Sequence, residues 1–82
     1  MTETNAIISI QEAASKNKIL SLTYRSKDGK ISHRSVEPYE IKDNGLYAYD
    51  LAKGSIRKFL LDGIVSAEVG STTFTPRYPI KI

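Results

Sequence analysis

The sequence contains few side chains that could catalyse a reaction. His33 is the single histidine, and there is no cysteine, which excludes thiol nucleophiles, disulfide bonds and cysteine zinc sites. No acid lies at a spacing that would complete a serine–histidine pair, and the isolated glycines form no phosphate-binding loop. Aspartates at turns usually accept hydrogen bonds from nearby backbone N–H groups, and four lie at or beside expected turns: Asp28, Asp43, Asp50 and Asp62. We therefore expect no enzyme, no metal site and no cofactor.

Basic and aromatic residues on predicted strands are more informative. An arginine can pair with a phosphate group while a tyrosine ring stacks on a base, the arrangement that proteins use to bind single-stranded nucleic acids. An alternative needs no ligand, because tyrosine is a common strand residue and a strand arginine often pairs with a carboxylate. If Lys53-Gly54 forms a two-residue turn, Arg57 lies opposite Asp50, and that ion pair explains Arg57. The candidates for binding are Arg25, Arg34, Arg57, Lys58, Tyr47 and Tyr49.

Length and composition predict one small domain over residues 1–82. Hydrophobic residues make up 40% of the 82 residues and charged residues 26%, as in ordinary globular domains. Twelve Lys and Arg against nine Asp and Glu give a net charge of +3, which is compatible with an anionic partner. No apolar run approaches the ~18 residues of a membrane span, and the first residues do not form a signal peptide, so we expect no membrane contact and a cytoplasmic protein.

The N-terminal part has the periodicity of a helix over about residues 5–16. Apolar residues recur at spacings of three, four and seven, which describes one helical face. Because a small domain cannot leave its only apolar stripe in water, we expect Ile7, Ile10 and Ala14 to pack onto the rest of the chain.

From Ile19 onward the period falls to two, which is typical of half-buried strands. Asp43-Asn-Gly45 is the strongest turn signal, and Pro38 is expected to interrupt the second strand, with a short continuation over 39–42. Two prolines indicate an extended tail over 72–82. The chain is thus mainly β with one N-terminal helix, and short strands at this spacing favour a small antiparallel β-barrel or sandwich. The predicted strands cover residues 19–25, 31–37, 46–51, 56–61 and 64–69.

Three segments in this order resemble the WYL domain family: Arg34-Ser-Val-Glu-Pro-Tyr, Gly45-Leu-Tyr-Ala-Tyr-Asp and Gly54-Ser-Ile-Arg-Lys-Phe-Leu-Leu-Asp-Gly-Ile64. The helix and the following Lys18-Ile-Leu-Ser-Leu-Thr-Tyr24 also match the opening of that family, so the resemblance covers roughly residues 5–75. It implies a small Sm-like or SH3-like β-barrel preceded by a helix. It also implies a ligand-sensing or nucleic-acid-binding regulatory module of bacterial or phage origin, because such domains accompany helix-turn-helix regulators, CRISPR-associated regulators and some helicases.

The resemblance assigns the basic pocket of the family to Arg34 and Arg57, and makes Tyr47 the counterpart of the family tyrosine. Gly63 stands where the family has an arginine, and Lys58 or His33 could replace the missing charge. The implied ligand is single-stranded nucleic acid or another anionic compound. The alternative is an accessory protein that binds a larger protein through the edge of its barrel and the 72–82 tail. We also expect this tail to be buried, on its own chain or on a second copy in a homodimer.

Overall fold

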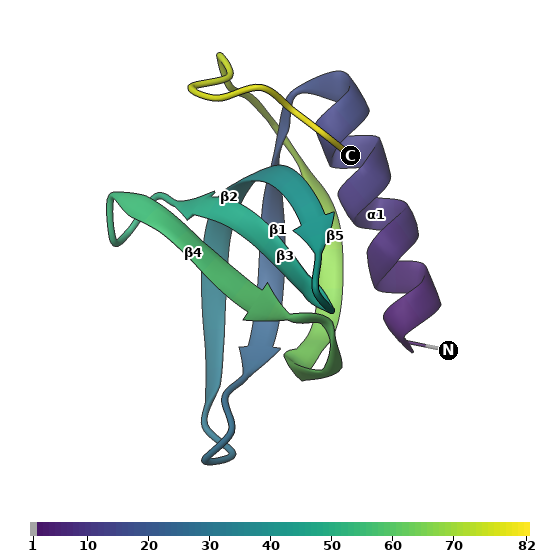
Figure 1. Cartoon of the computed structure of the whole chain (residues 1–82), viewed down its shortest axis with the longest axis vertical. Coiled ribbons are helices and arrows are strands. Elements are labelled where there is room, and N and C mark those ends of the chain that lie inside the picture. The colour runs from purple at the N-terminus through teal and green to yellow at the C-terminus, as the bar shows by residue number, and fades with distance from the viewer. Residues whose placement is uncertain (1) are drawn as a thin grey trace.

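The computed structural model describes residues 2–82, which form one helix and a five-stranded antiparallel sheet (Figure 1). The strand order is β4-β3-β2-β1-β5, so each strand except β5 lies next to its neighbour in the sequence. No helix in this part of the chain is long and apolar enough to cross a membrane. The elements are α1 (Thr2–Lys16), β1 (Lys18–Arg25), β2 (Ile31–Lys42), β3 (Gly45–Asp50), β4 (Ser55–Leu60), the 3-10 turn η1 (Leu61–Gly63) and β5 (Ile64–Thr73).

Helix α1 packs its apolar stripe into the core of the domain. Ile10 is fully buried and Ala14 nearly so, while Ile7 is partly buried against the same cluster. The opposite side of the helix faces solvent, as the 57% exposure of Ile8 shows. Asn17 then adopts a left-handed conformation with φ 54°, which ends the helix and leads directly into β1. The expected docking of the helix on the sheet is therefore observed.

Strand β2 runs for 12 residues through Pro38, where the sequence predicted an interruption. Pro38 is fully buried and opposite Ala48, whereas the next paired residue, Glu40, is opposite Tyr47. Tyr39 is therefore the extra residue of a β-bulge. The bulge lets the strand continue although proline has no N–H to donate to the ladder. The turn after β2 is the predicted one, with Asp43 and Asn44 at φ 54° and 59°, as a tight hairpin requires.

The sheet is bent but not closed. Within residues 2–82, β4 and β5 are its two edges, and no ladder joins them. The bend brings the end of β4 to the end of β1, where the Leu60 N–H donates to the Tyr24 hydroxyl at 3.1 Å and Phe59 packs edge-on against the Tyr24 ring. The mainly β, antiparallel fold with one helix is confirmed, but a closed Sm-like or SH3-like barrel is not.

The two faces of the sheet differ in what covers them. The core face carries the buried apolar side chains of the sheet, and α1 packs on it mainly at β5. Its central members are Leu20, Leu22, Val36, Leu46, Ala48 and Phe59. The other face, here called the outer face, is partly covered by the C-terminal segment 74–82. That segment starts where the Phe74 N–H donates to the Asn17 carbonyl and ends with a short parallel bridge between Lys81 and Glu40.

Candidate functional site

Arg34 projects from β2 onto the core face, opposite Leu22 of β1. Its Nη1 lies 3.3 Å from Oδ2 of Asp50, and its Nε donates to the Ser32 hydroxyl at 3.3 Å. The Arg34 side chain is 22% exposed, whereas the carboxylate of Asp50 is fully enclosed. A guanidinium has five N–H donors, so these two contacts fix its orientation and leave donors for a ligand.

Asp50 is held in turn by the chain that follows it. Its Oδ1 accepts hydrogen bonds from the backbone N–H groups of Ala52 and Lys53, at 3.0 and 3.3 Å. The turn between β3 and β4 covers residues 51–54, and Asp50 pairs with Ser55. The condition for pairing Asp50 with Arg57, a two-residue turn at Lys53-Gly54, is therefore not met.

Arg57 is consequently not the partner of Asp50. The longer turn shifts the register by two residues, which places Arg57 opposite Ala48 on the core face. Its side chain is exposed, and it forms no ion pair with any residue of the segment 5–82, whose side chains the structure describes. The ion pair that would have explained Arg57 without a ligand is thus made by Arg34.

Arg34 and Arg57 share one face of the sheet. Val36, Asp50 and Ser55 form one row across β2, β3 and β4. Arg34 lies two residues before Val36 and Arg57 two residues after Ser55, and side chains two residues apart in a strand point to the same side. Arg34 and Arg57, the two arginines that match the family pattern, therefore lie on opposite sides of this row on the core face.

The other candidate residues lie on the outer face. The alternation of β3 and β4 puts Tyr47, Tyr49 and Lys58 there. Lys58 is opposite Tyr47, and its ammonium lies 5.6 Å from the centre of the Tyr47 ring. On β1 and β2, Arg25 is exposed opposite Ile31, and the His33 Nδ1 shares a hydrogen bond of 3.2 Å with the Thr23 hydroxyl. The fold therefore separates these residues from Arg34 and Arg57. Neither Lys58 nor His33 is placed to complete the arginine pair.

A cluster on the outer face was not anticipated from the sequence. The buried carboxylate of Glu37 accepts hydrogen bonds from the Tyr39 hydroxyl at 2.7 Å and from Nε of Arg77 at 3.1 Å. The backbone N–H of Arg77 donates to the Tyr39 hydroxyl at 2.9 Å, and its guanidinium lies 4.1 Å from the centre of the Tyr49 ring. Burial raises the pKa of Tyr39 to about 12, and the hydrogen bond to Glu37 raises the pKa of Arg77. Because Arg77 and Glu37 are 40 residues apart, no local pattern signals this pair.

This cluster fixes the C-terminal segment on its own chain. The Tyr39 ring also packs edge-on against Phe74 and Tyr78, and the Tyr39 carbonyl accepts the Lys81 N–H at 2.7 Å. The tail is therefore docked on its own chain, but most of its residues remain exposed, Tyr78 at 47% and Ile82 at 37%, so the expected burial is met only in part.

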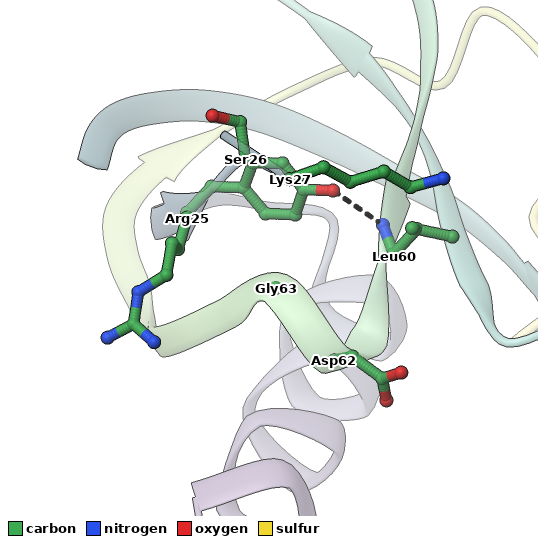
Figure 2. A pocket seen from close by; sticks show the side chains of 7 residues that line it. Arg25, Ser26, Lys27, Leu60, Asp62 and Gly63 are labelled. Carbon is green, nitrogen blue, oxygen red and sulfur yellow. Dashed lines mark hydrogen bonds between the residues drawn. The ribbon is translucent and has the colours of Figure 1, made fainter. Parts of the chain in front are cut away.

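Gly63, the position where the family has an arginine, borders a cleft of about 260 Å³ (Figure 2). A Cβ at Gly63 would lie 2.6 Å from the carbonyl oxygen of Arg25 and 2.7 Å from Cε1 of Tyr24. The two backbone segments are thus so close that only glycine fits at this position. The cations that line this cleft are Arg25 and Lys27, whose side chains extend in different directions in Figure 2. The missing arginine is thus explained by close packing between η1 and the end of β1.

The comparison with protein families agrees with this architecture. A model of the WYL domain matches residues 5–69. The chain belongs to the WYL domain family. The family match includes Arg34 and Arg57 but ends before the C-terminal segment that covers the outer face.

The WYL fold of this chain is also found in a solved structure. Proteasome accessory factor B/C (PafBC) of Arthrobacter aurescens superimposes with a TM-score of 0.77 at 23% identity, over 96% of this chain. The chain spans only 14% of the length of PafBC, and at this identity the likeness concerns the fold alone. No curated protein matches the sequence significantly.

Proposed function

We propose that this WYL domain is a non-catalytic regulatory module in the cytoplasm that binds an anionic ligand, single-stranded nucleic acid in the first place, through Arg34 and Arg57. The observation that carries the proposal is the pair of arginines on one face of the sheet, one oriented by an enclosed carboxylate and the other exposed and unpaired among the described side chains. Membership of a family of ligand-sensing regulators supports the regulatory part of the proposal.

The geometry of the arginine pair favours a phosphate-bearing ligand. The Arg34 guanidinium is oriented by Asp50 and Ser32, so binding costs little side-chain ordering. Charge-assisted, bidentate hydrogen bonds from such a guanidinium fit the oxygens of a phosphate. Arg57 adds a second positive charge on the same face, and the net charge of +3 attracts polyanions over longer distances.

A single strand fits this site better than a duplex. The sheet is bent (Figure 1), and the strand pairing places both arginines on its core face. A flexible single strand can follow a bent surface and bring successive phosphates to Arg34 and Arg57, whereas a rigid duplex would contact only the rim.

Fluorescence polarisation tests the proposal directly. We expect a labelled oligothymidylate of about 12 nucleotides to bind more tightly than a duplex of the same length. Its affinity should fall between about 50 and about 200 mM salt with a log–log slope of about −1.4 or steeper, since each phosphate that Arg34 or Arg57 neutralises contributes about −0.7. Absence of binding at the lower salt concentration, or an affinity independent of salt, would refute the proposal.

A further inference from the structure

The outer face contains a cleft that is built in part by the C-terminal segment. Its volume is about 230 Å³, and it lies between the sheet and the tail. The sheet contributes Tyr39, Glu40, Tyr47 and Ile56, and the tail contributes Tyr78, Pro79 and Lys81. The family match ends at residue 69, so the wall that the tail contributes lies outside the matched residues.

We infer that this cleft receives one base of a bound single-stranded nucleic acid, with the Tyr47 ring as the stacking surface. The inference rests on the proposed function and assigns the base-binding part of the same ligand. Pockets for drug-sized ligands measure about 300–1,000 Å³, so a cleft below that range suits a single planar ring. Tyrosine faces are the usual surfaces on which proteins stack unpaired bases.

The two outer-face tyrosines of β3 have different environments. The Tyr49 ring is covered by the Arg77 guanidinium at 4.1 Å, so it is already engaged with the tail. The Tyr47 ring borders the cleft and is half-buried. Tyr47 is therefore the stacking residue, and Tyr49 instead helps to hold the segment that forms the opposite wall.

The polar groups around the cleft suit a nucleotide. The Lys58 ammonium lies over the Tyr47 ring at 5.6 Å, where it can reach the phosphate next to a stacked base. Glu40 and Lys81 border the cleft with an acceptor and a donor for the edge of the base. The backbone bridge between these two residues and the Arg77–Glu37 contact keep the tail wall in place.

The cleft is connected to the arginine pair across one edge of the sheet. β4 is an edge strand, and its consecutive residues Arg57 and Lys58 point to opposite faces. A single strand that crosses this edge can bring one phosphate to Arg57 on the core face and the next to Lys58 on the outer face. Nucleic acid rather than a peptide is thus favoured by the continuity of positive charge around β4.

The test compares an oligothymidylate with an abasic oligomer of the same length, which keeps every phosphate and lacks the bases. We expect Tyr47→Ala to weaken binding of the oligothymidylate by about five- to 150-fold and to leave the abasic oligomer unchanged, since stacking contributes that factor for one base. Tyr47→Phe keeps the ring and should bind like the parent protein. Tyr78→Ala should show a smaller loss with the same dependence on bases, and thermal melts establish that each variant is folded.

The outcomes separate this inference from the proposed function. If folded Tyr47→Ala and Tyr78→Ala both bind oligothymidylate as the parent does, the base cleft is refuted while phosphate binding stands. If the loss for Tyr47→Ala is equal for both oligomers, the residue does not stack a base, and the inference is again refuted. If the parent protein binds neither oligomer, the proposed function fails and the inference fails with it.

Discussion

The core face and the outer face of the sheet each contain an arginine paired with a buried carboxylate, but the two pairs are built differently. On the core face, Arg34 and Asp50 come from neighbouring strands, and the carboxylate also fixes the turn that follows it. On the outer face, Glu37 comes from the sheet and Arg77 from the tail, and the arginine side chain is 48% exposed. The first pair is part of the sheet itself, whereas the second holds down a segment that could be released without unpairing a strand.

The difference separates an ion pair that orients an arginine within the sheet from one that holds a peripheral segment. An enclosed pair within the sheet presents a rigid guanidinium, which suits a ligand site because little freedom is lost on binding. A pair with one exposed partner tethers a peripheral segment and contributes less to stability. Substitutions on the two faces should therefore have effects of very different size.

The largest effect is expected from a substitution in the helix that packs on the core face. Ile10→Asp places a charge at a position with no exposed surface, and a domain of this size has too little stability to tolerate it. We expect the variant to be unfolded at room temperature by circular dichroism. Ile8→Asp is the matched control on the exposed side of the same helix and should melt close to the parent protein. A cooperative melt of Ile10→Asp at the parent temperature would contradict the docking of the helix.

The second-largest loss of stability is expected when the ion pair between Arg34 and Asp50 is removed. Arg34→Ala leaves the enclosed Asp50 carboxylate without its cation and should lower the free energy of unfolding in urea by about 3–5 kcal/mol. Arg57→Ala removes an exposed arginine that has no ion pair among the described side chains. This variant should change the free energy of unfolding by only about 0–1 kcal/mol. Equal losses for the two variants would contradict the assignment of Asp50 to Arg34.

A smaller effect is expected on the outer face. Arg77→Ala removes the cation from Glu37 but leaves the hydrogen bond from the Tyr39 hydroxyl, and the tail can loosen enough to admit water. The melting temperature should fall by a few degrees, less than for Arg34→Ala. Limited proteolysis should cut the variant within 74–82 faster than the parent protein, and equal cleavage rates would show that Arg77 does not hold the tail.

The smallest effect concerns alkaline pH. Burial raises the pKa of Tyr39 to about 12 from its ordinary 10.0, so the unfolded phenol ionises first. The free energy of unfolding that the protonated Tyr39 phenol contributes is therefore fully present below about pH 10 and is lost as the pH rises toward 12. Between about pH 9 and about pH 11 the parent protein should lose about 1 kcal/mol more than Tyr39→Phe does. Parallel pH profiles for the two proteins would contradict the burial of this phenol.

Local signals in the sequence were sufficient for much of the fold. The apolar stripe with Ile10 predicted the docked helix, and the turn residues Asp43 and Asn44 predicted the β2–β3 hairpin. The predicted interruption of the second strand at Pro38 was wrong because a β-bulge at Tyr39 lets the strand continue past the proline. The sequence contains no separate sign of this bulge. Closure into a barrel depends on the bend of the whole sheet, which short-range periodicity does not determine.

The candidate site was predictable only in part. The resemblance brought Arg34 and Arg57 together, and the structure places both on one face. The alternative that paired Asp50 with Arg57 depended on the length of one turn, and two further residues in that turn shift the register. The contact between Arg77 and Glu37 joins segments that only the folded chain brings together, so residue spacing could not reveal it.

The most direct test of the central claim compares Arg57→Ala with Arg25→Ala in binding to the labelled oligothymidylate at two salt concentrations. Both arginines are exposed and lie on strands, but Arg57 points to the core face and Arg25 to the outer face. We expect Arg57→Ala to weaken binding about five- to 150-fold and to reduce the salt slope by about 0.7, while Arg25→Ala binds nearly as the parent protein does. Equal affinities for the parent protein and Arg57→Ala, with both folded, would contradict an anion site on the core face.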